Sequence, residues 1–397
     1  MQKWIITANE QNQRLDKYLR RRLPAAGSSF LYKMMRKKNI TLNGKKAGGS
    51  ELIEEGDEIT LFLSDETIAK FAGSIAGRTS EAGARAGASE LSAAGAAGLA
   101  ASAHTGRSVS GTKRMTQAGN HASGTAGESG DLLRRITPAS ILYEDEHLLF
   151  VVKPAGVLSQ KAHPEDISMN EWLLDYLRGT GYLTPERLSM YRPSVCNRLD
   201  RNTGGILLCA KTLPASQMLS ALLRSRELEK YYRMVVRGTI TDPGEIRGMM
   251  EKDSRSNTVR FTTSPDCSAA NTHNSVVNLP KRGDGTLKQG VDGVCSETRY
   301  RPLRTQNSLT LVEALLVTGK THQLRAHFAS IGHPIAGDPK YGDPALNRRM
   351  RSQYGVRHQL LFACRLQFPP QLPEPFGYLA GRVFEAAEPE VFRRVMR

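Results

Sequence analysis

A long segment of small residues divides this chain and limits what it can fold into. Gly, Ala, Ser and Thr dominate residues 66–136, where bulky apolar side chains are scarce. Such a segment buries too little apolar surface to offset the entropy lost on ordering, so its composition predicts a flexible linker. The 397 residues therefore divide into a small module at 1–65 and a larger domain at 137–397.

The charge of the chain indicates a polyanionic partner. Its 55 Lys and Arg residues exceed its 39 Asp and Glu residues, which leaves a net charge of +16. A nucleic acid is the first candidate for such a partner, and an anionic membrane surface is the second. No apolar run approaches the length of a membrane span, and no apolar leader is visible, so we expect a cytoplasmic protein without a membrane partner.

Neither the cysteines nor the histidines predict a metal site. The five cysteines are dispersed and include no Cys-x-x-Cys pair, which favours reduced thiols over a disulfide framework. His322, His327 and His333 are five and six residues apart, which does not match the i, i+4 pair of a helical zinc site. Taken alone, these histidines predict structural roles, and we expect no metal.

The first module combines two basic helices with small strands. Residues 13–24 predict an amphipathic helix with its arginines on the exposed sides. The run SSFLYKMMRKK predicts a second helix, with Ser28 or Ser29 as its N-cap. A strand that ends in an Asn43-Gly44 turn and a closing strand in DEITLFL complete the module.

This order of elements resembles the S4-type RNA-binding domain. The matching runs are RLDKYL, LNGKK and GDEITLF. The resemblance implies that helical cations meet the phosphates of structured RNA. A small helix–strand domain with solvated cations is the alternative interpretation. The predicted RNA-binding residues are Arg14, Lys17, Arg21, Lys33, Arg36 and Lys37.

The run CNRLDRNTGGILLCAK at 196–211 contains the residue most indicative of chemistry, Asp200. Arg198 and Arg201 flank this acid, and two cations favour the ionised carboxylate that can act as a nucleophile. A Thr-Gly-Gly turn beginning at Thr203 precedes an apolar strand. The glycines allow a sharp turn, so we expect Asp200 on a rigid shelf at the mouth of a sheet.

This run closely resembles the catalytic motif of RluA-type pseudouridine synthases, His-Arg-Leu-Asp followed by two variable residues and Thr-Ser-Gly. Asn197 and Gly204 stand in place of its His and Ser. The run TGKTHQLRAHFASIGHPIAGDPKYG at 318–342 is a second match to the family. A third is Lys-Tyr-Tyr before Val-Val-Arg-Gly, where counting back from Gly238 selects Tyr232. The motifs occur in the order of the family.

The resemblance implies an α+β pseudouridine synthase fold with a mixed, largely antiparallel sheet, preceded by the small S4-like domain. It implies an enzyme that isomerises uridines in RNA, most often large-subunit ribosomal RNA, without a cofactor. Asp200 would be the nucleophile on a flipped-out nucleotide, Arg325 would pair with it, and Tyr232 would stack on the base and assist proton transfer. A monomer is the default expectation. The implied substrate-binding residues are Arg198, Thr203, His322 and Gln323.

Two other functions fit parts of the pattern. The first is a catalytically inactive RNA-binding factor in ribosome assembly, which the departures at Asn197 and Gly204 favour. The second is a glycosidase-type hydrolase, which needs a second carboxylate as acid, and Asp338 is the obvious candidate. The high positive charge suits a polyanion better than a neutral sugar.

Periodicity predicts the elements of the larger domain. The polar run at 253–295 lacks periodicity and predicts a partly disordered insertion. Helices are predicted at 171–182 and 215–232, and a third begins near Thr321. Strands are predicted within 141–156, from Ile206, and at 231–240, 297–303, 308–319 and 358–370.

Overall fold

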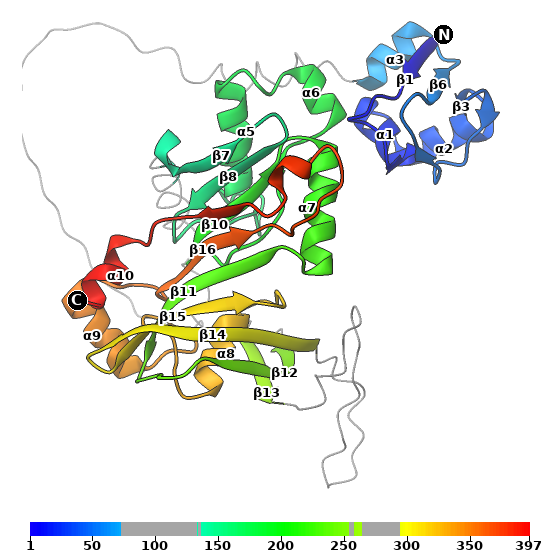
Figure 1. Cartoon of the computed structure of the whole chain (residues 1–397). Helices are drawn as coiled ribbons and strands as arrows, with labels where there is room; N and C mark the ends of the chain where they lie inside the picture. Colours follow the sequence, from blue (N-terminus) through cyan, green and yellow to red (C-terminus); the bar gives the residue numbers. More distant parts are fainter. Residues whose placement is uncertain (73–132, 134–135, 254–257, 264–293) are drawn as a thin grey trace, which may run out of the picture. The chain divides into compact units, whose positions relative to one another are not determined.

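The computed structural model describes residues 1–72, 133, 136–253, 258–263 and 294–397 (Figure 1). Most of the predicted linker and insertion therefore lies outside the described residues. The chain divides into two compact units. The first covers Met1–Thr125 with the short helix α6 (Pro185–Met190), and the second covers Ala126–Thr184 and Tyr191–Arg397. None of the described helices combines the length and apolar character that a membrane crossing requires.

The first unit contains the two predicted helices followed by the two predicted strands, β3 and β6, whereas β1, β2, β4 and β5 were not predicted. The predicted turn Asn43-Gly44, with φ of 50° and 71°, closes the hairpin between β3 and β4. The expected serine N-cap is wrong, because Gly27 caps α2 without a side-chain bond. The sheet order is β1-β6-β3-β4, and β2 pairs with β5. The elements are β1 (Gln2–Ile5), β2 (Gln13–Arg14), α1 (Leu15–Arg22), α2 (Ser28–Arg36), β3 (Ile40–Leu42), β4 (Lys45–Lys46), β5 (Leu52–Ile53) and β6 (Glu58–Leu61).

A further helix, α3 (Asp65–Ala72), occupies the first residues of the predicted linker. Ile68 is buried in the core of the first unit, and the ring of Phe71 lies 4.6 Å from that of Phe30. The apolar residues of this short stretch therefore extend the module beyond residue 65, because they find partners in its core.

The second unit is built on one mixed sheet of eleven described strands. Its order is β13-β12-β14-β15-β11-β16-β10-β8-β7, with β17 beside β16 and β9 beside β10. Only β10 and β16 run parallel among the described pairs, so the expected largely antiparallel sheet is confirmed. The strands are β7 (Ile141–Glu144), β8 (Leu148–Lys153), β9 (Ser194–Val195), β10 (Gly204–Ala210), β11 (Glu229–Arg237), β12 (Gly244–Asp253), β13 (Thr258–Thr263), β14 (Val294–Gln306), β15 (Leu309–Leu316), β16 (Leu361–Gln367) and β17 (Val383–Glu385).

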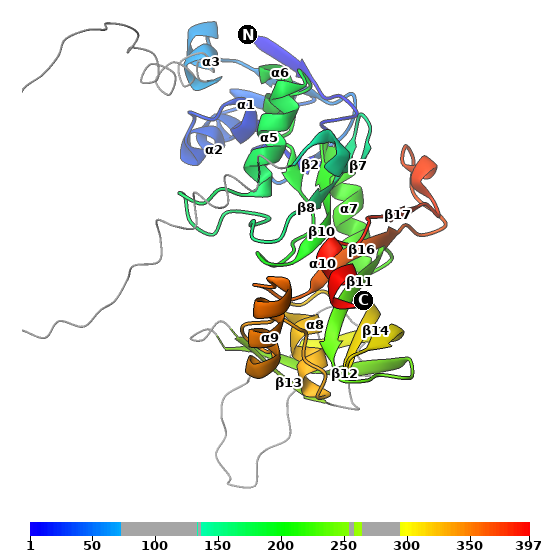
Figure 2. The same ribbon diagram turned by 90° about the vertical axis from the view of Figure 1, so that its left-hand side faces the viewer.

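Strand β10 lies inside the sheet, and all of its residues are buried. Burial on both faces explains why Ile206–Ala210 reads as a continuous apolar run instead of an alternating one. Helix α7 contacts β10 and lies beside the sheet in both views (Figures 1 and 2). Helix α8 packs on β13 and β14. The helices are α5 (Met169–Gly179), α7 (Leu213–Ser225), α8 (Gln323–Ser330), α9 (Pro344–Tyr354) and α10 (Glu390–Val395), with 3-10 turns at Pro138–Ser140 and Gly377–Leu379.

Three expectations for the second unit need correction. The helix predicted at 215–232 ends at Ser225, because Glu229 already pairs with β16 as the first residue of β11. Residues 258–263 within the predicted insertion form β13, which pairs with β12. Cys196, Cys209 and Cys364 are free thiols, but Cys295 is disulfide-bonded, so the expectation of five reduced thiols is wrong.

Candidate active site

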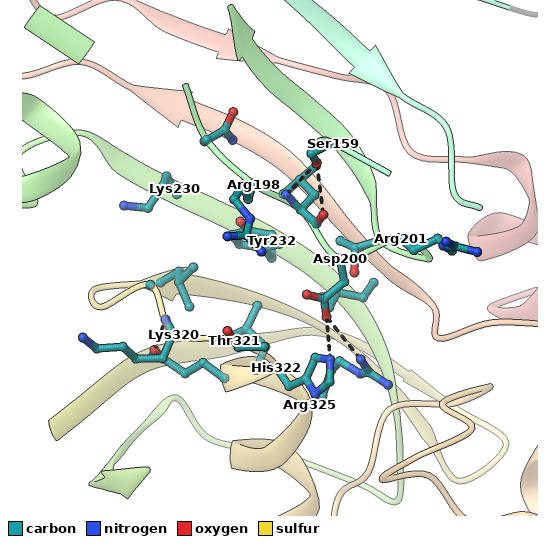
Figure 3. A pocket seen from close by; sticks show the side chains of 18 of the residues that line it. Ser159, Arg198, Asp200, Arg201, Lys230, Tyr232, Lys320, Thr321, His322 and Arg325 are labelled. Atoms are coloured by element: carbon teal, nitrogen blue, oxygen red, sulfur yellow. Dashed lines mark hydrogen bonds and ion pairs between the residues drawn. The ribbon is translucent and has the colours of Figure 1, made fainter. Parts of the chain in front are cut away.

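One pocket of the second unit, about 1000 Å³ in volume, contains every residue that the family motifs predicted for catalysis or substrate binding. Segments far apart in the sequence line it: the loop before β10, the start of β11 and the turn before α8 (Figure 3). The residues it brings together are Asp200, Tyr232, Arg325, Arg198, Thr203, His322 and Gln323. The sheet order explains this meeting, because only β16 separates β10 from β11.

Asp200 lies on a tight turn that leads into β10. The backbone N–H of Thr203 donates to the carbonyl of Asp200 at 3.0 Å, so the turn is earlier than predicted and the glycines already belong to the strand. Gly205 has a φ of +120°, and a Cβ there would lie 2.3 Å from the carbonyl oxygen of Ala363. Only glycine lets β10 approach β16 this closely. The Asp200 carboxylate remains 28% exposed and faces the pocket.

Arg325 connects two carboxylates. Its Nη1 donates to Asp200 Oδ2 at 3.2 Å, which places the predicted pair in contact. Its Nε and Nη2 donate to the two oxygens of Asp338 at 2.7 and 2.8 Å. Although burial opposes ionisation, Arg325 lowers the pKa of Asp338, and both acids help to raise the pKa of Arg325. The bidentate contact fixes the guanidinium plane and directs its third nitrogen at Asp200.

Asp338 does not fit the role of acid in a glycosidase. Its side chain is fully buried, its pKa is lowered, and its Oδ1 also accepts the backbone N–H groups of Lys340 and Tyr341. A carboxylate held ionised by an arginine has no proton to donate near neutral pH. The geometry of the described residues therefore argues against the hydrolase interpretation.

The sequence neighbours of Asp200 do not provide its counter-charge. Arg201 instead lies 3.9 Å from Asp166, and Arg198 is exposed at the pocket wall. Within the described chain, neither arginine forms an ion pair with Asp200. Arg325 instead supplies an ion pair with Asp200 from the opposite wall of the pocket.

His322 lies beside the same carboxylate. Its Nε2 is 3.8 Å from Asp200 Oδ2, and its Nδ1 is 3.1 Å from the hydroxyl of Tyr341. That hydroxyl accepts the backbone N–H of Val259 at 2.7 Å, so it can donate to His322 Nδ1. Burial lowers the pKa of His322. The residue caps α8 in a left-handed conformation, with φ of 55°, so the helix begins two residues later than predicted.

Thr203 and Gln323 are both buried and bonded to the protein. Thr203 Oγ1 accepts a hydrogen bond from Gln359 Nε2 at 3.3 Å. Gln323 Nε2 donates to the carbonyl of Glu297 at 2.9 Å and to Thr298 Oγ1 at 3.0 Å. Its Oε1 accepts from the backbone N–H of Lys320 at 3.1 Å. These contacts stabilise the pocket walls, and substrate binding by either residue stays a prediction.

Tyr232 lies in the pocket, whereas Tyr231 does not line it. A register irregularity between the two residues occurs where β11 pairs with β16. The side chain of Tyr232 is 7% exposed, and burial raises the pKa of its phenol well above the ordinary value. Tyr231 instead donates to Glu229 at 2.7 Å and stacks under Arg365. Counting back from Gly238 therefore selected the tyrosine that reaches the pocket. The side chain of Tyr232 is a neutral phenol there.

Lys153 is a buried cation behind the turn that carries Asp200, and its role was missed in the sequence. Its Nζ donates to the carbonyls of Val157 at 2.7 Å and Arg201 at 3.0 Å. Burial lowers its pKa to about 7. The ammonium ties the turn after β8 to the loop that carries Asp200. The Lys-Pro-Ala-Gly turn at 153–156 was the available signal, but only the fold shows what the lysine contacts.

The two departures from the family motif have local physical reasons. Asn197 Oδ1 accepts the backbone N–H of Leu208 at 2.8 Å, and its Nδ2 donates to the carbonyl of Ile206 at 3.4 Å. The amide thus holds the loop against β10. At Gly204, a Cβ would lie 3.3 Å from both the Lys153 carbonyl and the Phe362 ring, so a larger residue would crowd this strand.

The residues predicted to contact RNA through the small module all lie in the first unit. Lys17, Lys33, Arg36 and Lys37 are exposed, as such contacts require. Arg14 is also exposed but pairs with Asp16 at 3.1 Å, and Arg21 is partly buried. Across the described ranges of both units, no three His, Cys, Asp or Glu side chains are grouped as metal ligands.

Comparison with known proteins points to one family. The RNA pseudouridylate synthase family profile matches residues 147–330. The "Ribosomal large subunit pseudouridine synthase C" of Rickettsia bellii is 30% identical over 345 residues, which cover 86% of this chain and 87% of that protein. The Escherichia coli K12 protein of the same name is 26% identical, over 91% of this chain and 87% of its own length. The structure titled "Human RNA Pseudouridylate Synthase Domain Containing 4" aligns with a TM-score of 0.48 at 19% identity, over 68% of this chain and 94% of that one.

Proposed function

Because the chain belongs to the RluA-type family of RNA pseudouridine synthases, we propose that it isomerises specific uridines of large-subunit ribosomal RNA with Asp200 as nucleophile. The names of the similar Rickettsia and Escherichia proteins support this substrate. The net charge of +16 suits a polyanionic RNA. The observation that carries the proposal is the contact of Arg325 Nη1 with Asp200 Oδ2 at 3.2 Å inside a pocket that also holds Tyr232.

The reaction needs a nucleotide outside the RNA stack. A uridine flipped into the pocket would place its ribose and base between Asp200 and Tyr232. Asp200 attacks the nucleotide, the bond from the ribose to N1 breaks, and the detached base turns. The bond from Asp200 to the nucleotide then breaks as the ribose bonds to C5, C5 loses its proton, and N1 regains a proton. The reactant and product have the same formula, so the reaction consumes no cosubstrate.

The surrounding residues have distinct roles in this proposal. Arg325 orients Asp200, and Asp338 holds Arg325 in place. Tyr232, a neutral phenol, stacks on the base and assists removal of the C5 proton. Arg198 and His322 border the flipped nucleotide. The exposed cations of the S4-like module dock the RNA in the cytoplasm, and the enzyme acts as a monomer.

The test is the substitution Asp200→Asn, which removes the nucleophile and changes little volume. We expect no pseudouridine formation, while RNA binding stays near the wild-type level. Pseudouridine mapping of total RNA from cells that lack the protein, complemented with wild type or the variant, gives the sites and the activity together. Rescue by Asp200→Asn, or an unchanged map, would favour an RNA-binding assembly factor instead.

A further inference from the structure

The charges that line the active-site pocket are strongly unbalanced. Asp200 is the only acid among the pocket-lining residues of the described chain. Asp200 and Asp338 both pair with Arg325, and Asp166 lies near Arg201. The other basic residues that line the pocket are Arg198, Arg224, Arg226, Lys230, Lys320 and Lys340.

Lys230 is the least expected of these cations. It is 92% buried, since its relative exposure is 8%, and its side chain enters the pocket from the start of β11. Its Nζ donates to the carbonyl of Leu228 at a long 3.4 Å. No carboxylate of the described chain pairs with it. A buried ammonium with one weak contact is costly unless an anion completes the site.

Two further cations converge on the same place. Arg226 ends α7 in a left-handed conformation, with φ of 67°, and Lys320 lies in the turn before α8. Burial is the main cause of the lowered pKa of Lys230 and of Lys320. Repulsion by Arg226 lowers both pKa values further, because the three cations are neighbours in the pocket. Figure 3 shows Lys230 and Lys320 at one end of the pocket and Asp200 and Arg325 toward the other. The described ranges hold no ion pair for Arg226 or Lys320.

We propose that Lys230, Lys320 and Arg226 form an anion subsite that binds one backbone phosphate of the RNA beside the flipped uridine. Their elements meet only in the folded unit, and together they present at least three cationic donors to one volume of the pocket. A phosphate provides the charge and the several acceptor oxygens that such a set requires. This proposal rests on the proposed function, because it places the substrate chain relative to Asp200.

The test uses the full-length protein and a fluorescent RNA that contains a single uridine in an oligoadenylate. The variant combines Arg226→Asn with Lys320→Gln. Asparagine tolerates the left-handed backbone at 226, and the Lys320 backbone N–H can keep its bond to Gln323. We expect about tenfold weaker binding at low salt. The slope of log affinity against log KCl concentration should fall by about 0.7, the value for one lost contact to a single strand.

The control removes the same charge elsewhere in the second unit. Arg348→Gln with Arg349→Gln alters two exposed residues of α9, and we expect the wild-type affinity and slope. Equal losses in the control and the pocket variant would mean that only bulk charge matters, which would overturn the proposal. Lys320→Gln alone serves if the double variant fails to fold.

A second measurement locates the phosphate. Neutral methylphosphonate linkages are placed one at a time on either side of the uridine. In the wild type, one position should weaken binding about tenfold, and in the pocket variant the same position should have no further effect. Additive losses at every position would refute the subsite. These assays need no turnover, so an enzyme that forms no pseudouridine would contradict the proposed function and leave the binding result interpretable.

Discussion

The substitution Asp338→Asn tests whether Arg325 depends on a buried partner to hold Asp200. Asp338 is fully buried and accepts two bonds from Arg325 and two from backbone N–H groups. Asp338 Oδ1 accepts three of these bonds, and Oδ2 accepts the fourth, from Arg325 Nε. If the asparagine Oδ1 keeps its three bonds, the amide NH2 group replaces Oδ2 and faces Arg325 Nε. One charge-assisted bond is then lost, and two donors face each other.

The expected loss of stability and activity follows because the charge of the buried Arg325 would be only partly compensated. Breaking one partner of a buried pair costs about 3–5 kcal/mol, which in a domain of this size corresponds to a fall in Tm of roughly 6–20 °C. Single-turnover pseudouridine formation should fall at least about a hundredfold, because Asp200 loses its fixed orientation. Thermal unfolding and rapid-quench assays measure the two effects.

A matched control makes the same Asp-to-Asn substitution at a more exposed site. Asp343 caps α9 and pairs with Arg237 at 2.7 Å, with both side chains partly exposed. Asp343→Asn should cost about 1 kcal/mol or less and leave turnover unchanged. If Asp338→Asn behaves like this control in both assays, Arg325 does not need Asp338 and the reasoning fails.

Three further predictions concern residues around the site. Burial lowers the pKa of His327 from 6.5 to about 4, so the unfolded chain binds the proton more readily and stability should fall by about 3 kcal/mol as pH decreases from 6.5 to 4. Urea unfolding across this range checks it, and His327→Asn should remove that component. Gly205→Ala should destabilise the second unit by more than about 3 kcal/mol, because its Cβ would lie 2.3 Å from the Ala363 carbonyl; calorimetry showing a native-like Tm would contradict this. Lys153→Met should lower kcat about tenfold or more, with RNA affinity kept, because the carbonyl of Arg201 loses its anchor; a wild-type kcat would show that the turn holds Asp200 without this lysine.

The comparison of sequence and structure shows which features are local. Strand β10 and the Asn43-Gly44 turn were predictable, because the sequence pattern of a buried strand or a two-residue turn lies within a few neighbouring residues. Helix α7 was predicted too long, because Glu229 and the residues after it pair with β16 instead of extending the helix. Strand β13 was missed, because its short alternation of Val259 and Phe261 lies inside a long polar run and its partner β12 is identified only by the pairing.

The sequence by itself determined the family, the net positive charge of the chain and the three segments that carry Asp200, Tyr232 and Arg325. The order of the motifs and the count of charged residues can be read without a structure. The resemblance also implied the pairing of Arg325 with Asp200, and only the tertiary structure decided the other charge contacts. Arg201, next to Asp200 in the chain, lies by Asp166, whereas Arg325, 125 positions away, contacts the carboxylate. Asp338 became the partner of Arg325, and Lys230 and Lys320 came to one end of the pocket. Ion pairing depends on distances of a few ångströms, and the sheet order, not the spacing along the chain, sets those distances.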